Sequence, residues 1–206
     1  MKTIAILSNK GGAGKTTLAI HLAVAAEQAS KRAVVLDLDP QGSATTWSEA
    51  RDDETPAVVP THARHLTRVL EAAEVNGADI AIVDTAPHSE ATSLAAARAT
   101  DLVLVPCRPT LFDLHAIRET LDIAMLAKKP AKVILNAVPP RGSLARQARD
   151  AVASYEIEPA PYELGHRVAY VHAIIKGITA QEYQPKSKAA IEIKNLYNWI
   201  MTEVLK

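Results

Sequence analysis

The sequence predicts an α/β fold, a doubly wound and mostly parallel sheet with helices on both faces. Two observations favour this class. The segments with strand character are continuous apolar runs, as expected for strands that are buried on both faces. Along the 206 residues these runs alternate with longer amphipathic segments, the order produced by repeated strand–helix units. Because no internal repeat or linker interrupts this order, residues 1–206 are expected to form a single domain.

Six segments are predicted to be strands. Each is short and rich in Val, Ile, Leu or Ala, and the third is expected to lie at an edge of the sheet. Prolines follow several of them closely, which marks the strand ends. In chain order the segments are Thr3–Ser8, Ala33–Leu38, Ala57–Thr61, Asp79–Asp84, Asp101–Pro106 and Ala131–Asn136.

The segments between the strands are predicted to be helices. The last one carries apolar residues from Ile191 to Leu205 that could lie on a lipid surface. We expect it to pack on the sheet instead, because a doubly wound fold of this length can spare few helices. A further helix is expected to start near Ser43. The others are Lys15–Gln28, Arg64–Val75, Ser89–Arg98, Leu114–Ala127, Leu144–Tyr155 and Lys186–Leu205.

The strongest chemical signal directly follows the first strand. Residues 8–17 read S-N-K-G-G-A-G-K-T-T, so a Gly-Lys-Thr lies where a strand turns into a helix. Glycines let backbone N–H groups close around phosphate oxygens, and the helix N-terminus adds partial positive charge. We therefore predict a site for ATP and Mg²⁺, with Lys15 on the β- and γ-phosphates and the Thr16 hydroxyl on the metal. The ATP-binding residues of the loop are Gly11, Gly12, Ala13, Gly14, Lys15, Thr16 and Thr17.

Acidic residues end the next two strong strands. Asp37 and Asp39 are two residues apart and so share one face of the strand, and Asp84 ends the strand that follows. Three carboxylates beside one phosphate loop repel each other unless a metal ion or a proton relieves them. Because Mg²⁺ keeps several waters and takes few protein ligands, Asp37 and Asp84 are expected to act on it through water or through Thr16.

The loop departs from the standard G-x-x-x-x-G-K-[ST] pattern. Asn9 stands where the first glycine belongs, and a second lysine, Lys10, precedes the glycines. This K-G-G-x-G-K-T-T form resembles the deviant Walker-A loop of the ParA/MinD family of P-loop NTPases. D-L-D-P-Q at 37–41 and D-T-A-P at 84–87 resemble that family's switch I and switch II, and V-P-C-R-P-T-L-F-D at 105–113 resembles its proline-containing loop near the nucleotide and the dimer interface.

The resemblance implies roles for single residues in slow, partner-stimulated hydrolysis of ATP to ADP and phosphate. Lys10, Lys15 and Asp39 are the implied catalytic residues. Lys10 would neutralise phosphate charge on the nucleotide of a second copy, and Asp39 would position the attacking water. An alternative role for Asp39 is to cap the helix that starts near Ser43. The family counterpart of Asn136 hydrogen-bonds adenine, although an asparagine before Pro139 and Pro140 can also simply form a turn.

The segment R-V-A-Y-V-H-A-I-I-K-G at 167–177 resembles short ParA-type partition ATPases, so the resemblance spans essentially the whole chain. Because the phosphate loop begins at residue 10, the chain is expected to lack the long N-terminal DNA-binding extension of larger relatives. The resemblance implies a homodimer gated by ATP and a centromere-binding or adaptor protein that stimulates hydrolysis. Plasmid, chromosome or another cargo could be partitioned.

Charge is distributed unevenly. Residues 1–127 carry 11 Lys and Arg against 16 Asp and Glu, net −5, and residues 128–206 carry 12 against 7, net +5. By itself this is better explained by solvated surface, with the acids gathered near the metal site, than by a DNA footprint. Together with the resemblance, it leads us to expect nonspecific DNA binding in the ATP state, with contacts from Arg141, Arg146, Arg167, Lys176, Lys186 and Lys188.

The expected location is the cytoplasm, on the nucleoid. Cys107 is the only cysteine, and no signal peptide or apolar membrane span is recognisable. Two other functions share parts of the pattern: a MinD-like ATPase at a membrane surface, and a metabolic P-loop ligase of the dethiobiotin-synthetase type. The ligase needs a pocket for an acid substrate, which cannot be identified in the sequence. Lys10 and the D-L-D-P-Q segment favour the partition switch.

Overall fold

A computed structural model describes residues 1–205. Their strands form one six-stranded sheet in the order β3-β2-β4-β1-β5-β6, and every pair of neighbouring strands is parallel. The predicted α/β class is confirmed, and β3 lies at an edge as expected. The strands are β1 (Lys2–Ile6), β2 (Ala33–Asp37), β3 (Ala57–Pro60), β4 (Ile80–Asp84), β5 (Leu102–Cys107) and β6 (Ala131–Leu135).

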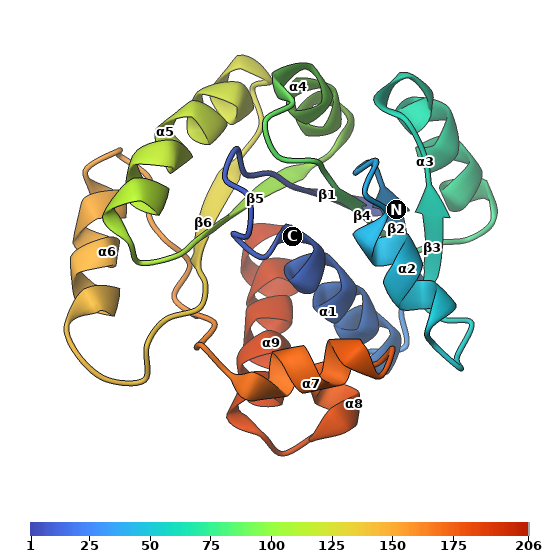
Figure 1. The fold of residues 1–206 in the computed structure, drawn as a ribbon. Coiled ribbons are helices and arrows are strands. Elements are labelled where there is room, and N and C mark those ends of the chain that lie inside the picture. The colour runs from blue at the N-terminus through green and yellow to red at the C-terminus, as the bar shows by residue number, and fades with distance from the viewer. Residues whose placement is uncertain (206) are drawn as a thin grey trace.

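Helices cover both faces of the sheet (Figure 1). Side chains of β1 and of Leu7, which follows it, alternate between two cores: Ile4 and Ile6 pack with α1 and α9, and Ala5 and Leu7 pack with the helices of the opposite face. The helices are α1 (Lys15–Gln28), α2 (Ser43–Glu49), α3 (Leu66–Val75), α4 (Glu90–Ala99), α5 (Leu111–Leu126), α6 (Leu144–Ala153), α7 (Val168–Ile175), α8 (Ala180–Tyr183) and α9 (Lys188–Trp199).

Most predicted boundaries are within a few residues of the observed ones. Helix α5 begins three residues earlier than expected because Thr110 caps it, its hydroxyl accepting a hydrogen bond from the Asp113 N–H. The segment that contains α7 and α8 was not predicted to be helical. Val168–Ile175 is apolar almost throughout and therefore shows no helical period, and α8 is only four residues long.

The C-terminal helix packs on the sheet, as predicted. Ile193, Leu196 and Ile200 are fully buried in the core that also contains α1. The expected single helix ends at Trp199 and continues as a π-helical turn over Ile200–Val204. Among the described residues, no helix combines the length and apolarity that a membrane crossing requires.

A buried histidine fastens α1 to the α7–α8 segment. His21 Nε2 accepts a hydrogen bond from the Ala180 N–H at 3.0 Å, so the proton of the neutral ring is on Nδ1, which donates to the Thr17 carbonyl at 2.7 Å. The Gln181 amide donates to the His21 carbonyl at 2.8 Å, and the ring of Tyr170 meets the His21 ring edge-on. The helix that follows the phosphate loop is thereby joined to the C-terminal part of the chain.

This histidine gives stability a pH dependence. Burial lowers the pKa of His21 from 6.5 to about 4, opposed only partly by the bond to Thr17 and the charge of Glu182. As the pH falls through this interval, the unfolded chain binds a proton that the folded chain does not, so stability that is complete near neutral pH is lost. Wild type should lose up to about 3 kcal/mol more than His21→Gln between about pH 7 and pH 4. Urea unfolding at both pH values measures this, and equal losses in the two proteins would refute it.

Candidate nucleotide-binding site

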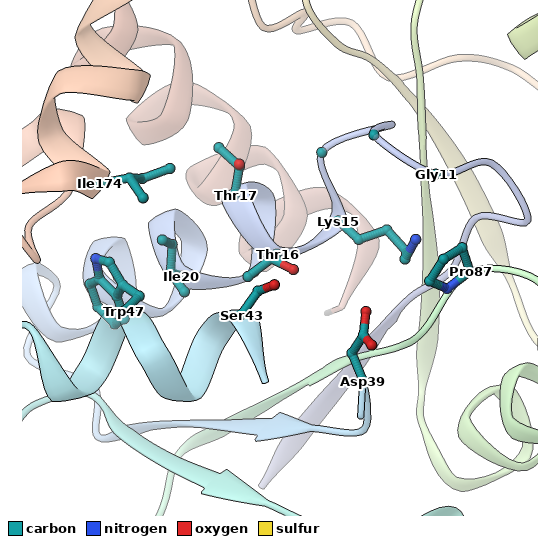
Figure 2. A pocket seen from close by; sticks show the side chains of 12 residues that line it. Gly11, Lys15, Thr16, Thr17, Ile20, Asp39, Ser43, Trp47, Pro87 and Ile174 are labelled. Atoms are coloured by element: carbon teal, nitrogen blue, oxygen red, sulfur yellow. The ribbon is translucent and has the colours of Figure 1, made fainter. Parts of the chain in front are cut away.

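A pocket of about 350 Å³ lies where the phosphate loop enters α1 (Figure 2). Gly12 and Gly14 have positive φ angles of 72° and 93°, a conformation that favours glycine. Gly14 is the N-cap of α1 and no side chain of the described residues caps the helix, so the first N–H groups remain available to an anion. The loop residues that line the pocket are Gly11, Gly12, Gly14, Lys15, Thr16 and Thr17.

Lys15 is buried against this pocket. Its Nζ donates to the Ser8 carbonyl at 3.3 Å. Burial lowers its pKa, and the carboxylates of Asp84 and Asp39 oppose that shift. Of the described residues that line the pocket, Lys15 is the only cation. The loop therefore presents one desolvated positive charge together with backbone donors, which suits a phosphate group.

Asp37 and Asp84 face each other on neighbouring strands, in register and buried. Asp84 Oδ2 accepts from the Thr16 hydroxyl at 2.6 Å, whereas Asp84 Oδ1 is buried without a hydrogen-bond partner among the described residues. Burial raises the pKa of Asp84 to about 7, and the nearby charges of Asp37 and Asp39 add to this effect. The charge of Lys15 and the hydrogen bond from Thr16 oppose this shift only in part, so an excess of negative charge remains beside the phosphate loop.

These residues fit a magnesium ion. Thr16 supplies a hydroxyl oxygen, and Asp84 offers an unpaired buried carboxylate oxygen beside it. Hard oxygen ligands and an excess of negative charge are what Mg²⁺ requires. Thr16 would hold the ion and Asp84 would hold one of its waters. When bound, the ion would neutralise phosphate charge and lower the barrier to phosphoryl transfer.

Unlike Asp84, Asp37 has hydrogen-bond partners for both of its carboxylate oxygens. Its Oδ2 accepts from the Thr45 N–H at 3.0 Å and from the Thr45 hydroxyl at 2.9 Å, and its Oδ1 accepts from the Asp39 N–H at 3.1 Å. Asp37 therefore anchors the first turn of α2 to the strand that precedes it. Its contact with a metal-bound water remains a prediction.

Asp39 lines the pocket, and Figure 2 shows its carboxylate on the same side as Lys15. The alternative role of capping α2 is wrong: the N-cap is Gly42, no side chain caps the helix, and Asp37 takes the Thr45 N–H. The side chain of Asp39 instead accepts from the Gln41 N–H at 2.9 Å. The geometry leaves this carboxylate facing the space that a phosphate and its attacking water would occupy.

Lys10 is half-buried and is not one of the residues that line the pocket of its own chain. Its backbone N–H donates to the Ser8 hydroxyl at 3.2 Å. Asn9, the residue that replaces the usual glycine, anchors the loop to α5: its N–H donates to the Thr120 hydroxyl at 3.3 Å and its amide donates to Glu119 at 3.1 Å. This anchor could not be predicted from local sequence, because its two acceptors lie 110 and 111 residues away along the chain.

The far wall of the pocket is apolar. Figure 2 shows Ile20, Trp47 and Ile174 at the end opposite to Lys15. None of these was a predicted site residue. Ile174 belongs to α7, which was not predicted from the sequence, and Trp47 belongs to α2. No local motif marks either residue, because the wall exists only where three distant segments meet.

Arg51 fixes α7 and α8 to α2. Its buried guanidinium donates twice to Glu182, at 2.6 and 3.0 Å, and once to the Gly177 carbonyl at 3.3 Å. The indole N–H of Trp47 donates to the Ile178 carbonyl at 3.4 Å. The apolar wall is thus tied to the helix that follows Asp39.

Asn136 lies against the phosphate loop. Its amide donates to the Ala13 carbonyl at 2.7 Å. Arg108 also lies beside the loop, 3.9 Å from the position that a Cβ on Gly12 would take, and it pairs with Asp113 at 2.9 Å. The adenine contact predicted for Asn136 remains a prediction.

The six residues predicted to contact DNA do not form one patch within a single chain. Arg141 and Arg146 lie at and before α6, at one end of the sheet, whereas Lys176, Lys186 and Lys188 lie around α7, α8 and α9 (Figure 1). These five side chains are exposed. Arg167 is half-buried and bound to Glu192 at 2.6 Å, so its charge is already paired.

Known proteins resemble this chain in sequence and in fold. Residues 4–178 match the family model described as the CobQ/CobB/MinD/ParA nucleotide binding domain. Maintenance of carboxysome distribution protein A from Gloeobacter kilaueensis is 39% identical over 144 residues, 68% of this chain and 65% of that protein. The protein of the same name from Halothiobacillus neapolitanus is 27% identical over 209 residues, 97% of this chain and 96% of that protein.

The fold is similar to that of the septum site-determining protein MinD from Pyrococcus horikoshii, solved with Mg-ADP. The TM-score is 0.79 at 18% identity, and the match covers 98% of this chain and 96% of that one. Since the family model spans most of the sequence, this chain belongs to the CobQ/CobB/MinD/ParA nucleotide-binding family.

Proposed function

We propose that this ParA/MinD-family ATPase is a dimerising switch that uses Mg-ATP to position a cargo over DNA. One observation carries the proposal: the loop holds two lysines, and only Lys15 lines the pocket of its own chain. A second lysine in the loop that does not line its own pocket is suited to reach the nucleotide of a second copy.

In the proposed reaction, Lys15 and the N–H groups of Gly12 to Thr16 hold the β- and γ-phosphates. Asp39 accepts a hydrogen bond from the attacking water and orients it toward the γ-phosphorus. Lys10 of the second copy stabilises the charge that develops on the transferred group, as an arginine finger does. Hydrolysis then removes the group that holds the two copies together, which resets the switch.

Exposed apolar side chains support association of two copies. Leu111 and Phe112 are exposed at the start of α5, which follows the carboxyl end of β5, the edge of the sheet that bears the pocket. Val168, Val171 and Ile175 are exposed on α7, whose Ile174 lines the pocket. Apolar patches of this kind mark interaction sites on soluble proteins.

The proposed DNA surface forms only in the dimer. Each chain carries two separate basic groups, one around α6 and one around α7 to α9, and pairing two chains doubles the number of phosphate contacts. With about six or more contacts, raising salt from about 50 to 200 mM should weaken binding by about 10³-fold. The nucleoid association expected from the sequence follows from this binding.

A gel shift with random-sequence duplex DNA tests this part of the function, with ATP or ADP and at both salt concentrations. We expect the protein to bind DNA with ATP but not with ADP, and to show the steep salt dependence described above. Lys186→Ala/Lys188→Ala should flatten the salt dependence, whereas Lys31→Ala, an exposed lysine at the amino end of β2, should not. Equal binding with ATP and ADP would overturn the DNA-binding proposal.

The cargo is proposed to be a plasmid, a chromosome or a large protein assembly. Two relatives are named for the maintenance of carboxysome distribution, which supports an assembly as one such cargo. A centromere-binding or adaptor protein is proposed to link the switch to the cargo and to stimulate hydrolysis. Neither alternative function gains support. Helix α9 is packed in the core, which argues against a role on a membrane surface. A ligase would need a cation for its acid substrate, and Lys15 is the only cation among the described residues that line the pocket.

A further inference from the structure

Asn136 makes a contact that the proposed ATPase cycle does not use. It directly follows β6, and its backbone N–H donates to the Cys107 carbonyl at 2.8 Å, which fixes the residue to the end of β5. Its side-chain Oδ1 accepts from the Ala137 N–H at 2.8 Å, so the amide has one orientation. The Nδ2 group then donates to the Ala13 carbonyl at 2.7 Å, 123 residues earlier in the chain.

The fit between this amide and the loop is tight. A Cβ on Gly14 would lie only 2.2 Å from Asn136 Nδ2, so no larger residue at position 14 could share the site with Asn136 as it is placed. Gly14 also has a φ of 93°, which penalises a side chain independently. The lack of a side chain and the positive φ angle of Gly14 therefore both permit the hydrogen bond between the Asn136 amide and the Ala13 carbonyl.

This contact sets the direction of a phosphate donor. A trans peptide is planar, with its C=O and N–H pointing in opposite directions. Because the Ala13 C=O points at Asn136, the Gly14 N–H points away from Asn136. Gly14 lines the pocket, and its N–H is one of the donors at the start of α1.

We propose that Asn136 is a positioning residue that holds the Ala13–Gly14 peptide so that the Gly14 N–H faces the phosphates. Asn136 then acts on the phosphate end of every nucleotide instead of selecting adenine. The inference rests on the proposed function for the ligand. The same amide could have two roles, recognition of the adenine base or positioning of the phosphate loop, and the inference assigns the second.

The test compares three ligands, ATP, GTP and inorganic tripolyphosphate, by calorimetric titration of wild type, Asn136→Ala and Asn136→Asp. We expect Asn136→Ala to weaken all three by a similar factor of about 10, the value of one hydrogen bond. Asn136→Asp keeps the shape, loses the donor and adds negative charge, so it should weaken all three further. Asn76→Ala is the matched control, because the Asn76 amide also donates to a backbone carbonyl, that of Ala72, but at the C-terminal end of α3.

An NMR measurement distinguishes a loss of loop positioning from a general loss of folded structure. With ¹⁵N-glycine labelling, the eight glycines give few amide signals, and tripolyphosphate should shift the Gly14 signal downfield in wild type but not in Asn136→Ala. A loss confined to ATP, with GTP, tripolyphosphate and the Gly14 shift unchanged, would overturn the inference in favour of base reading. Unchanged binding of all three would overturn it as well. If wild type itself binds none of them, the proposed function fails too.

Discussion

Replacing Lys15 with methionine is expected to weaken ATP and ADP binding by at least about 10²-fold and to abolish measurable hydrolysis. Methionine keeps most of the buried aliphatic part of the side chain packed and removes only the ammonium group. The loss of binding and hydrolysis therefore measures the contribution of the positive charge. Without it, the phosphates would face Asp84 and Asp39, the two carboxylates whose charge acts on Lys15, and no compensating cation would remain among the described residues that line the pocket.

Calorimetric titration and a phosphate-release assay measure this loss. Lys31→Met is the control, since Lys31 is exposed and lies at the amino end of β2, whereas the pocket lies at the carboxyl ends of the strands. Thermal unfolding of both variants separates binding from folding. Near-wild-type affinity in Lys15→Met would mean that the pocket is not the nucleotide site.

Replacing Lys10 with alanine is expected to have an equally large effect on turnover but almost none on ADP binding. The side chain does not line its own pocket, so the affinity of a single chain for ADP should stay within about twofold. Hydrolysis should fall by about 10³-fold, the lower end of the range for a cation supplied by a partner. ADP titration and phosphate release measure the two effects separately.

Complementation gives the sharper version of this prediction. Asp39→Ala should bind ATP but hydrolyse it poorly, and it still carries Lys10. Mixed with Lys10→Ala, it can supply its lysine to a pocket that retains Asp39 and Lys15, so the mixture should recover a substantial part of the wild-type rate. Two inactive proteins that stay inactive when mixed would show that Lys10 acts within its own chain.

The sheet and the phosphate loop were predictable because their signals are local. Continuous apolar runs at Ile4, Ile82 and Leu104 mark strands buried on both faces, and the spacing of Gly14, Lys15 and Thr16 marks a strand-to-helix turn that binds phosphate. The paired carboxylates of Asp37 and Asp84 also followed, since parallel strands end at the same edge of the sheet.

The contacts that could not be predicted join residues that are distant in sequence. His21 reads as one polar residue in an apolar helix, and only the fold brings the Ala180 N–H to its ring. Ile174 lies in an apolar stretch without a helical period, so its place in the pocket wall had no sequence signal. Asn136 was assigned to adenine by resemblance, whereas its contact with Ala13 is a property of the folded loop.

The central claim is that ATP, and not ADP, joins two copies. The most direct measurement is the molecular mass in solution of wild type and Asp39→Ala, by light scattering after size exclusion, with no nucleotide, with Mg-ADP and with Mg-ATP. We predict the mass of one chain in the first two conditions and the mass of two chains with Mg-ATP, more completely in Asp39→Ala because hydrolysis is slowed. A mass that is the same in all three conditions, whether of one chain or of two, would contradict the claim.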